Sequence, residues 1–431
     1  PEAGKWLIAA GEALFGMNSF GWRIASAVVG ALTILVLARL VLRMTGSIVV
    51  ACLGGFALAI DGLHLTMSRL ALLDGFVTFW IVCAVACLAA DRDWLRERLP
   101  GNPRRPWQWA AGVCFGLACG TKWNGVYALA VFGVVIVLWE VAHRLRSRAG
   151  QPHRLRADGL PVRELLVAGL PALGRLVGVA FVVYVATWGG WLANHAEYED
   201  RFGRGYGDEP AWGSYVTDPS TGALGTSADA LRSLWHYHLM TYRFHTGDYL
   251  AGKTHPYESD ATAWLVLNRP VSATVQLDIP ADECGARASS YCLRETLLLG
   301  NPVIWWAGLL ALAVSIIAWM RSLRQGRVTW WPVPLAGVVA TWVPWLPIRD
   351  RPIFSFYSVA TLPFLVMALA LAFHAAWYRA TGRRRRKTVV LAGGVFVVLS
   401  IAATAYFWPV WTYGLISQDS WHDRMWFKTW V

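Results

Sequence analysis

The chain has 431 residues, of which 56% are hydrophobic and 15% charged, and its mean hydropathy is positive. This composition excludes an ordinary soluble protein. The net charge of +12 could suggest a nucleic-acid partner. However, the basic residues fall in separate connectors between apolar runs and do not form one patch, so we expect no nucleic-acid binding.

Taken in chain order, ten apolar runs qualify as membrane spans, which need about 20 residues, and the run 107–121 is the shortest of them. They are residues 20–42, 47–65, 70–90, 107–121, 125–142, 176–192, 301–320, 330–347, 354–377 and 388–410. We therefore expect an all-α polytopic membrane protein of about ten transmembrane helices, with both ends of the chain on the same side. The chain begins Pro-Glu-Ala-Gly-Lys, and we expect one further span upstream of it, which would make about eleven.

Alternate connectors carry the basic residues, and this pattern predicts the orientation. The basic connectors are residues 39–43, 92–105, 144–163, 321–327 and 379–387. An excess of Lys and Arg marks the cytoplasmic side of a membrane protein. The other connectors, including a long loop over 191–300, are therefore predicted to be external. That loop contains two cysteines, Cys284 and Cys292, which we expect to pair on an oxidising external face.

The most unusual external segment runs from Asp61 to Asp74 and includes His64 and Arg69. Ionisable groups near the hydrocarbon are costly and usually functional. Arg69 could instead extend to the interface and pair with Asp74. Structural roles near the interface are equally open for Asp61 and His64.

Two further external turns carry cations. Lys122 lies in the turn Thr121–Gly125, and Arg349 and Arg351 lie between two predicted spans. Lys122 beside Trp123 could be an interfacial anchor, and the two arginines could be ordinary loop charges. However, basic residues on the external side oppose the topological bias, which is the general excess of Lys and Arg on the cytoplasmic side. An anionic ligand such as a lipid phosphate would explain them, because Arg and Lys both bind phosphate.

The long loop predicts an amphipathic helix over residues 231–245 that lies on the membrane. Its three histidines could suggest zinc, but they lack metal-ligand spacing, so we expect no metal site from them. His238 could instead bind phosphate or sugar hydroxyls, or simply pack. The turn His255-Pro256-Tyr257-Glu258-Ser259 combines polar groups with an aromatic face, which suits a sugar or a peptide.

These motifs occur in an order that resembles the bacterial protein O-mannosyltransferases, integral-membrane glycosyltransferases of the GT-C class. The resemblance spans nearly the whole chain. Its carriers are Gly4-Lys5-Trp6-Leu7-Ile8, Ser68-Arg69 with Leu72-Leu73-Asp74, Gly120-Thr121-Lys122-Trp123-Asn124-Gly125, His255 to Ser259, Asn268-Arg269-Pro270-Val271, Gly300 to Trp306, and Arg424-Met425-Trp426. No segment resembles the β-trefoil module of eukaryotic members.

The resemblance implies a polyprenyl-phosphate-mannose donor, secreted proteins with Ser or Thr as acceptors, and an inverting displacement. A base must take the acceptor proton, and fixed cations or a divalent metal such as Mg²⁺ or Mn²⁺ would stabilise the departing phosphate. The family's proposed base lies in an Asp-Glu pair before the Gly-Lys-Trp segment. That pair does not occur here, so we expect the base in a missing N-terminal segment and leave the catalytic residue unassigned.

The resemblance and the positions together predict the site roles. The predicted ligands of the donor phosphate are Arg69, Lys122, Arg351 and Arg349, with Asp74 orienting Arg69. The predicted sugar or acceptor ligands are His255, Tyr257, Glu258, His238 and Asn124.

The predicted organisation has three parts. Residues 1–190 form an N-terminal membrane part with the Arg69 and Lys122 clusters, 191–300 the external loop, and 301–431 a C-terminal membrane part with an external tail. We expect a multi-pass protein of the bacterial plasma membrane with its active site outside. The competing readings are another GT-C transferase with a lipid or glycan acceptor, and a transporter or flippase, which would place charges near the midplane in related halves.

Overall fold

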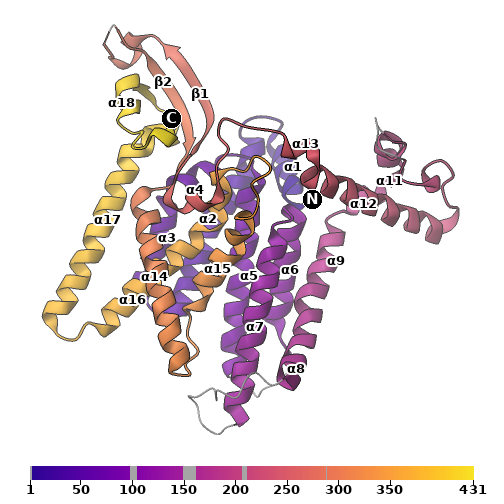
Figure 1. The fold of residues 1–431 in the computed structure, drawn as a ribbon, viewed down its shortest axis with the longest axis horizontal. Coiled ribbons are helices and arrows are strands. Elements are labelled where there is room, and N and C mark those ends of the chain that lie inside the picture. The colour runs from indigo at the N-terminus through magenta and orange to yellow at the C-terminus, as the bar shows by residue number, and fades with distance from the viewer. Residues whose placement is uncertain (1, 98–103, 149–161, 206–210, 288) are drawn as a thin grey trace.

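The computed structural model describes residues 2–97, 104–148, 162–205, 211–287 and 289–431, without the side chains of 146–148. The connectors 98–103 and 149–161, which carry part of the predicted basic pattern, lie outside the described residues. The chain forms an apolar helical bundle with a small sheet above one end (Figure 1). We call this end of the bundle the sheet end.

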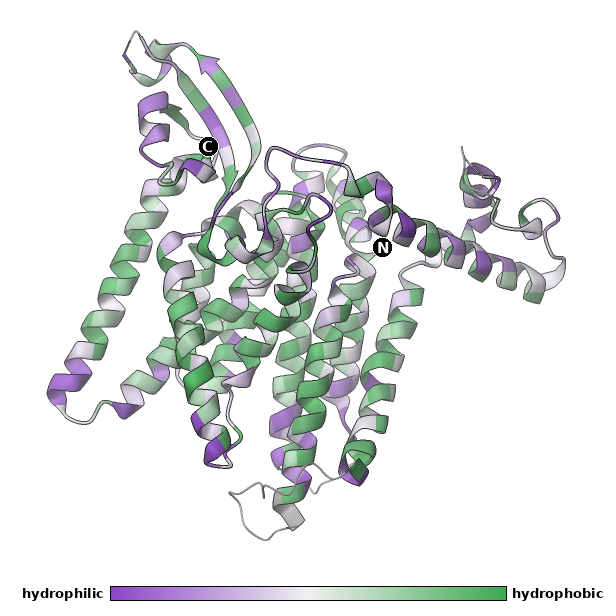
Figure 2. Cartoon of the chain, in the orientation of Figure 1, coloured by the Kyte–Doolittle hydropathy of each residue, from purple (hydrophilic) through white to green (hydrophobic). Residues whose placement is uncertain are grey.

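Seven helical segments in the described chain are long and apolar enough to cross a membrane. They are α2 (Gly21–Thr45), α5 (Leu73–Arg96), α7 (Gly125–Arg148), α8 to α9 (Val162–Leu173 and Val179–Ala186, joined by a π-helical turn), α14 (Pro302–Arg324), α16 (Leu362–Arg379) and α17 (Arg383–Trp411). Figure 2 shows that their middles are hydrophobic and that polar residues gather at both ends. A multi-pass membrane protein is therefore confirmed.

The expected count of ten spans is not confirmed, because three of the predicted runs form shorter helices. These are α3 (Ile48–Ala59), α6 (Pro106–Thr121) and α15 (Pro332–Thr341). At 1.5 Å per residue, α3 and α15 extend ~18 Å and ~15 Å, less than the ~30 Å hydrocarbon core. The run 47–65 breaks at Asp61, which caps the separate helix α4 (Gly62–Met67) by accepting a hydrogen bond from the His64 N–H at 3.0 Å.

Helix α5 lies at the centre of the bundle, where it packs against α2 and α6. Its side chains Val77, Ile81 and Val82 are almost fully buried, and a large continuous hydrophobic core extends from them to α14 and α16. Helix α17 leans away from the bundle at its Arg383 end (Figure 1). Its Trp411 end returns to the core, because Trp411 is fully buried against α4.

The remaining helices lie at or beyond the sheet end (Figure 1). Helix α12 confirms the helix predicted within the long loop and extends it to 25 residues. These remaining helices are α1 (Ala3–Phe15), α10 (Gly189–Ala193), α11 (His195–Tyr198), α12 (Gly222–Thr246), α13 (Asp248–Ala251) and α18 (Gln418–His422). Helices α1 and α18 both lie at the sheet end, in agreement with the expectation that the two ends of the chain lie on the same side.

A three-stranded antiparallel sheet, absent from the sequence-based prediction, stands above the bundle. Its strands are β1 (Val271–Ile279), β2 (Cys292–Leu298) and β3 (Leu415–Ser417), in the order β1-β2-β3. Cys284 and Cys292 are joined by a disulfide, the pairing expected from the sequence. This bond ties the β1–β2 connection to the start of β2.

Candidate active site

The first group of polar residues at the sheet end surrounds Lys122. Helix α6 ends at Thr121 beside the first turn of α5, which contains Asp74. The Lys122 ammonium forms an ion pair with the Asp74 carboxylate at 2.7 Å and lies 4.1 Å from the centre of the Tyr357 ring. Asp74 was expected to orient Arg69, but the structure pairs it with Lys122, because the packing of α5 against α6 brings these two side chains together.

Arg351 contacts His245 of α12, and both Arg351 and Lys122 act electrostatically on that histidine. The Arg351 guanidinium donates to the His245 Nδ1 at 3.3 Å. Burial, and then the charges of Arg351 and Lys122, lower the pKa of His245. Burial and the Asp74 charge raise the pKa of Tyr357 to about 12, while the charge of Arg351 acts in the opposite direction and lowers it. We call Asp74, Lys122, His245, Arg351 and Tyr357 the lysine cluster.

Arg69 lies in a different place, at the wall of a cavity of about 580 Å³. Its guanidinium donates to the carbonyl oxygen of Trp411 at 3.3 Å. The cavity is lined by Arg23, Thr66, Arg69, Leu70, Thr274, Arg294, Thr296, Trp411, Thr412 and Tyr413. We call it the arginine cavity. The structure therefore brings Lys122 and Arg351 together, as expected, but places Arg69 in a separate cationic group.

The position of Arg69 follows from the buried network around Asp61. The fully buried Asp61 carboxylate accepts hydrogen bonds from the Asn301 N–H at 2.8 Å and the Trp305 indole N–H at 2.9 Å. A side chain at Gly62 would collide with the Trp411 ring, because its Cβ would lie 1.9 Å from Cε2. Asp61 and Gly62 thus hold α4 between α14 and α17, which supports a structural role for Asp61.

The sheet contributes the third arginine of the cavity through its strand register. Thr274 pairs with Thr296, and Gln276 pairs with Arg294. Since side chains alternate across a strand, Arg294 and Thr296 face the cavity while Glu295 points to the other side. There Glu295 accepts a hydrogen bond from the Trp421 indole at 2.6 Å, and burial raises its pKa.

His238, predicted to bind sugar or acceptor, instead connects helices. Its Nδ1 donates to the Leu234 carbonyl at 2.7 Å, so its Nε2 accepts from the Tyr184 hydroxyl. Tyr184 in turn accepts from the Trp123 indole at 2.9 Å. Both ring nitrogens are therefore used within the protein, and we revise the prediction to a positioning role that links α12 to α9.

The predicted turn His255–Ser259 is largely bonded to itself. The His255 backbone N–H donates to Glu258 at 3.0 Å, the Tyr257 N–H donates to the His255 ring at 3.1 Å, and the His255 ring packs edge-on against Phe354. Asn124 differs, because its buried side-chain oxygen has no hydrogen-bond partner in the described chain. The sugar or acceptor roles of these residues remain predictions.

Arg349 does not join either cationic group by any described contact. Its guanidinium lies 3.9 Å from Asp260, and its side chain is 72% exposed. Among the described residues, no three His, Cys, Asp or Glu side chains form a group that could hold a metal ion. The Mg²⁺ or Mn²⁺ ion that the resemblance allows therefore remains a prediction.

The sequence analysis did not select Arg23 and Arg294, which line the arginine cavity together with Arg69. The sequence could have indicated Arg23, because it lies in the first turn of α2, at the end of the helix opposite Arg39 and Arg43. It therefore opposes the topological bias just as Arg69 does. For Arg294 there was no such indication, since its place in the cavity depends on a sheet that was not predicted.

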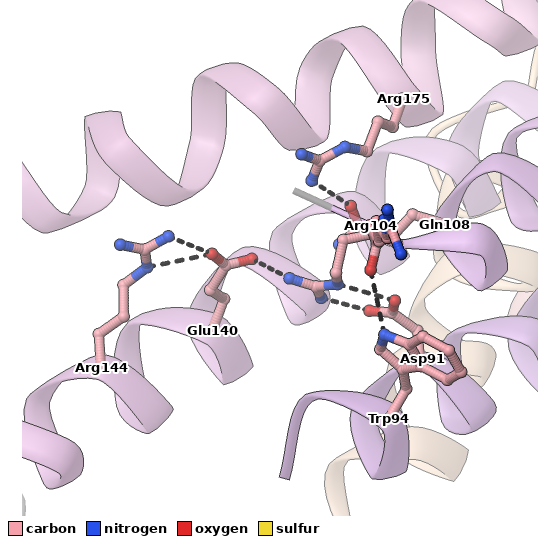
Figure 3. A network of polar contacts seen from close by, with 8 residues as sticks. Asp91, Trp94, Arg104, Gln108, Glu140, Arg144 and Arg175 are labelled. Atoms are coloured by element: carbon pink, nitrogen blue, oxygen red, sulfur yellow. Dashed lines mark hydrogen bonds and ion pairs between the residues drawn. The ribbon is translucent and has the colours of Figure 1, made fainter. Parts of the chain in front are cut away.

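Figure 3 shows a third charged network, which lies where α6 begins at Pro106, at the end of that helix opposite Lys122. Arg105, which is 1% exposed, donates from Nε to Asp91 at 2.9 Å and from Nη1 to Glu140 at 2.7 Å. Glu140 also accepts from Arg144, and Arg175 donates to Gln108. This network ties α5, α6, α7 and the π-helical turn together far from the sheet, so we regard it as structural.

Comparison of the fold identifies the class of membrane protein. The structure is similar to the yeast (S. cerevisiae) protein O-mannosyltransferase Pmt1-Pmt2 complex bound to the sugar donor, with a TM-score of 0.72 and 14% sequence identity. The match covers 100% of this chain and 86% of that chain. At this identity the similarity shows the fold, which is that of the GT-C glycosyltransferases.

Sequence comparisons identify the family. Residues 1–173 match the family described as dolichyl-phosphate-mannose-protein mannosyltransferase, and residues 230–430 match the C-terminal four TMM region of protein-O-mannosyltransferase. The chain is 36% identical to the polyprenol-phosphate-mannose–protein mannosyltransferase of Mycobacterium tuberculosis, over 100% of this chain and 80% of the relative. Its Corynebacterium glutamicum counterpart is 32% identical, over 100% and 81%. The chain belongs to the protein O-mannosyltransferase family and is a glycosyltransferase.

Proposed function

We propose that this protein transfers mannose from a polyprenyl-phosphate-mannose lipid to the hydroxyl of Ser or Thr in secreted proteins. The observation that carries the proposal is the 36% identity to a polyprenol-phosphate-mannose–protein mannosyltransferase over the whole chain. The geometry adds support, because cationic side chains gather where an apolar helix bundle meets a polar layer. A lipid phosphate with an apolar tail requires that combination.

We further propose that the sheet end faces the outside of a bacterial plasma membrane. Basic residues dominate the other end, where Arg43 pairs with Asp93 and Arg144 pairs with Glu140. This distribution is typical of the cytoplasmic side. The Cys284–Cys292 disulfide belongs to the sheet end and fits an oxidising compartment.

The proposed reaction is a single displacement at the anomeric carbon. The acceptor oxygen forms a bond to C1 as the bond from C1 to the phosphate oxygen breaks. The electron pair stays on the phosphate, and the acceptor proton goes to a base. Charge on the phosphate grows during the step, so guanidinium groups placed there stabilise the transition state more than the bound donor.

The test is transfer of labelled mannose from polyprenyl-phosphate-mannose to a Thr-containing peptide by the purified full-length protein. The proposal predicts label in the peptide and inversion at the anomeric carbon. Label found only in a lipid or glycan acceptor would favour another transferase. Movement of the lipid across vesicles without covalent transfer would favour a flippase.

Sidedness is tested with sealed membrane vesicles of known orientation. The acceptor peptide should be modified when it is on the outer face and protected from modification on the inner face. The opposite result would reverse the proposed orientation.

A further inference from the structure

Three guanidinium groups from distant parts of the chain line the arginine cavity. Arg23 comes from α2, Arg69 from the connection between α4 and α5, and Arg294 from β2. Among the described residues that line this cavity, none is Asp or Glu. Three like charges around about 580 Å³ repel one another, so this arrangement favours an anion between them.

The remaining lining residues suit an anion that bears several oxygen atoms. Thr274 and Thr296 form a cross-strand pair beside Arg294. Tyr413 lies in the same wall, where its hydroxyl donates to the side-chain oxygen of Gln276 at 3.4 Å, so in the described chain the free hydroxyls are those of the two threonines. Hydroxyl groups and guanidinium groups together provide the donors that phosphate oxygens require.

The lysine cluster is less suited to this role because its charge is already partly neutralised. Lys122 is paired with Asp74 at 2.7 Å, and the Arg351 guanidinium donates to the His245 ring. In the arginine cavity, by contrast, the described protein contact of Arg69 is a single hydrogen bond to a backbone carbonyl. The arginine cavity therefore has the larger unbalanced positive charge.

We propose that Arg23 and Arg294 hold, together with Arg69, the phosphate of the lipid donor. This inference rests on the proposed function and adds two residues to its site. The phosphate enters as a diester with one negative charge. When the C1–O bond breaks, the electron pair stays on the phosphate oxygen, and the product is a monoester with a charge of about −2. Three guanidinium groups favour that product-like charge.

The position of Arg294 also indicates a function for the sheet. It is placed by pairing with Gln276 on one side and with Leu415 of β3 on the other. The disulfide at Cys292 lies two residues before it. The sheet is therefore a wall of the donor site, which explains why a helical enzyme keeps a small sheet directly above its bundle.

The test measures binding of polyprenyl phosphate without sugar, so it does not depend on transfer. Titration into the purified full-length protein in micelles compares the wild type with Arg294→Gln and Arg23→Gln. Arg287→Gln is the matched control, because Arg287 is exposed near the same sheet and lies outside the cavity lining. Each cavity variant should bind roughly tenfold more weakly, and the control should match the wild type.

Arg294→Lys separates charge from geometry and should recover part of the lost affinity. Thermal unfolding in the same micelles shows whether each variant is folded. Cavity variants that are folded and bind polyprenyl phosphate as tightly as the wild type would overturn the inference, even if the wild type transfers mannose to peptide. Failure of that transfer would instead overturn the proposed function.

Competition distinguishes the lipid phosphate from other phosphate sources. Inorganic phosphate and phosphatidylglycerol vesicles, at equal phosphate concentration, should displace polyprenyl phosphate only weakly. Equal displacement by either would show a general phosphate site and overturn the assignment to the donor.

Discussion

The Lys122–Asp74 ion pair should respond asymmetrically to loss of each partner. Lys122→Met leaves the Asp74 carboxylate, whose side chain is 7% exposed, without its cation. Removing one partner of a buried pair costs about 3–5 kcal/mol. Asp74→Leu leaves an ammonium whose side chain is 27% exposed and which contacts the Tyr357 ring. Because that ammonium can be solvated, we expect a cost of only about 1–2 kcal/mol.

The double variant, Lys122→Met with Asp74→Leu, should recover most of the stability, because apolar replacement of a buried pair is often neutral. The assay is reversible unfolding in mixed micelles, followed by tryptophan fluorescence, with mannose transfer measured in parallel. Equal small costs for the two single variants that add in the double variant would show that the ion pair does not couple Lys122 and Asp74. A stable but inactive double variant would show that the Lys122–Asp74 pair also takes part in transfer.

Three further predictions concern other parts of the molecule. Arg105→Met should destabilise the protein by about 3–5 kcal/mol, because it leaves Asp91 buried without a cation. The KM for the donor should not change. Unfolding measures the first effect and steady-state kinetics the second. His245 has a lowered pKa, so its contribution to stability is present above about pH 6.5 and is lost as pH falls through the lower pKa of the folded state. The stability difference between wild type and His245→Gln should therefore shrink between pH 7.5 and pH 5, and a difference independent of pH would contradict this. Replacing Cys284 and Cys292 by Ser opens a loop of eight residues and should lower stability by about 2–3 kcal/mol, measured by unfolding with and without reductant.

The membrane fold could be predicted from the sequence because hydropathy and the placement of Arg report directly on the bilayer. Seven of the predicted runs overlap helices long enough to span, although the run 176–192 matches only the second half of the span Val162–Ala186. The run 330–347 did not, because α15 ends at Thr341 and a 3₁₀ turn containing Pro344 follows. A proline removes the backbone donor that a continuing helix requires. Apolar composition alone cannot show such breaks.

The candidate site could be predicted only in part. Arg69, Lys122 and Arg351 could be selected because they oppose the topological bias. Which of them lie together depends on tertiary packing. Asp74 lies five positions from Arg69 in sequence, yet it pairs with Lys122 across the α5–α6 contact. Arg294 joins Arg69 only through the β1–β2 register, which local sequence patterns did not predict.

The role of Arg69 as the ligand of the donor phosphate can be tested on mannose transfer itself. Its most direct test measures label transfer to a Thr-containing peptide by the full-length wild type, Arg69→Ala and the control Arg287→Ala. We predict that the wild type and the control are active. Arg69→Ala should lose roughly 10²–10³-fold in rate while remaining folded, because a guanidinium stabilises the charge that develops on the phosphate. Near-normal transfer by Arg69→Ala would show that Arg69 does not hold the donor phosphate.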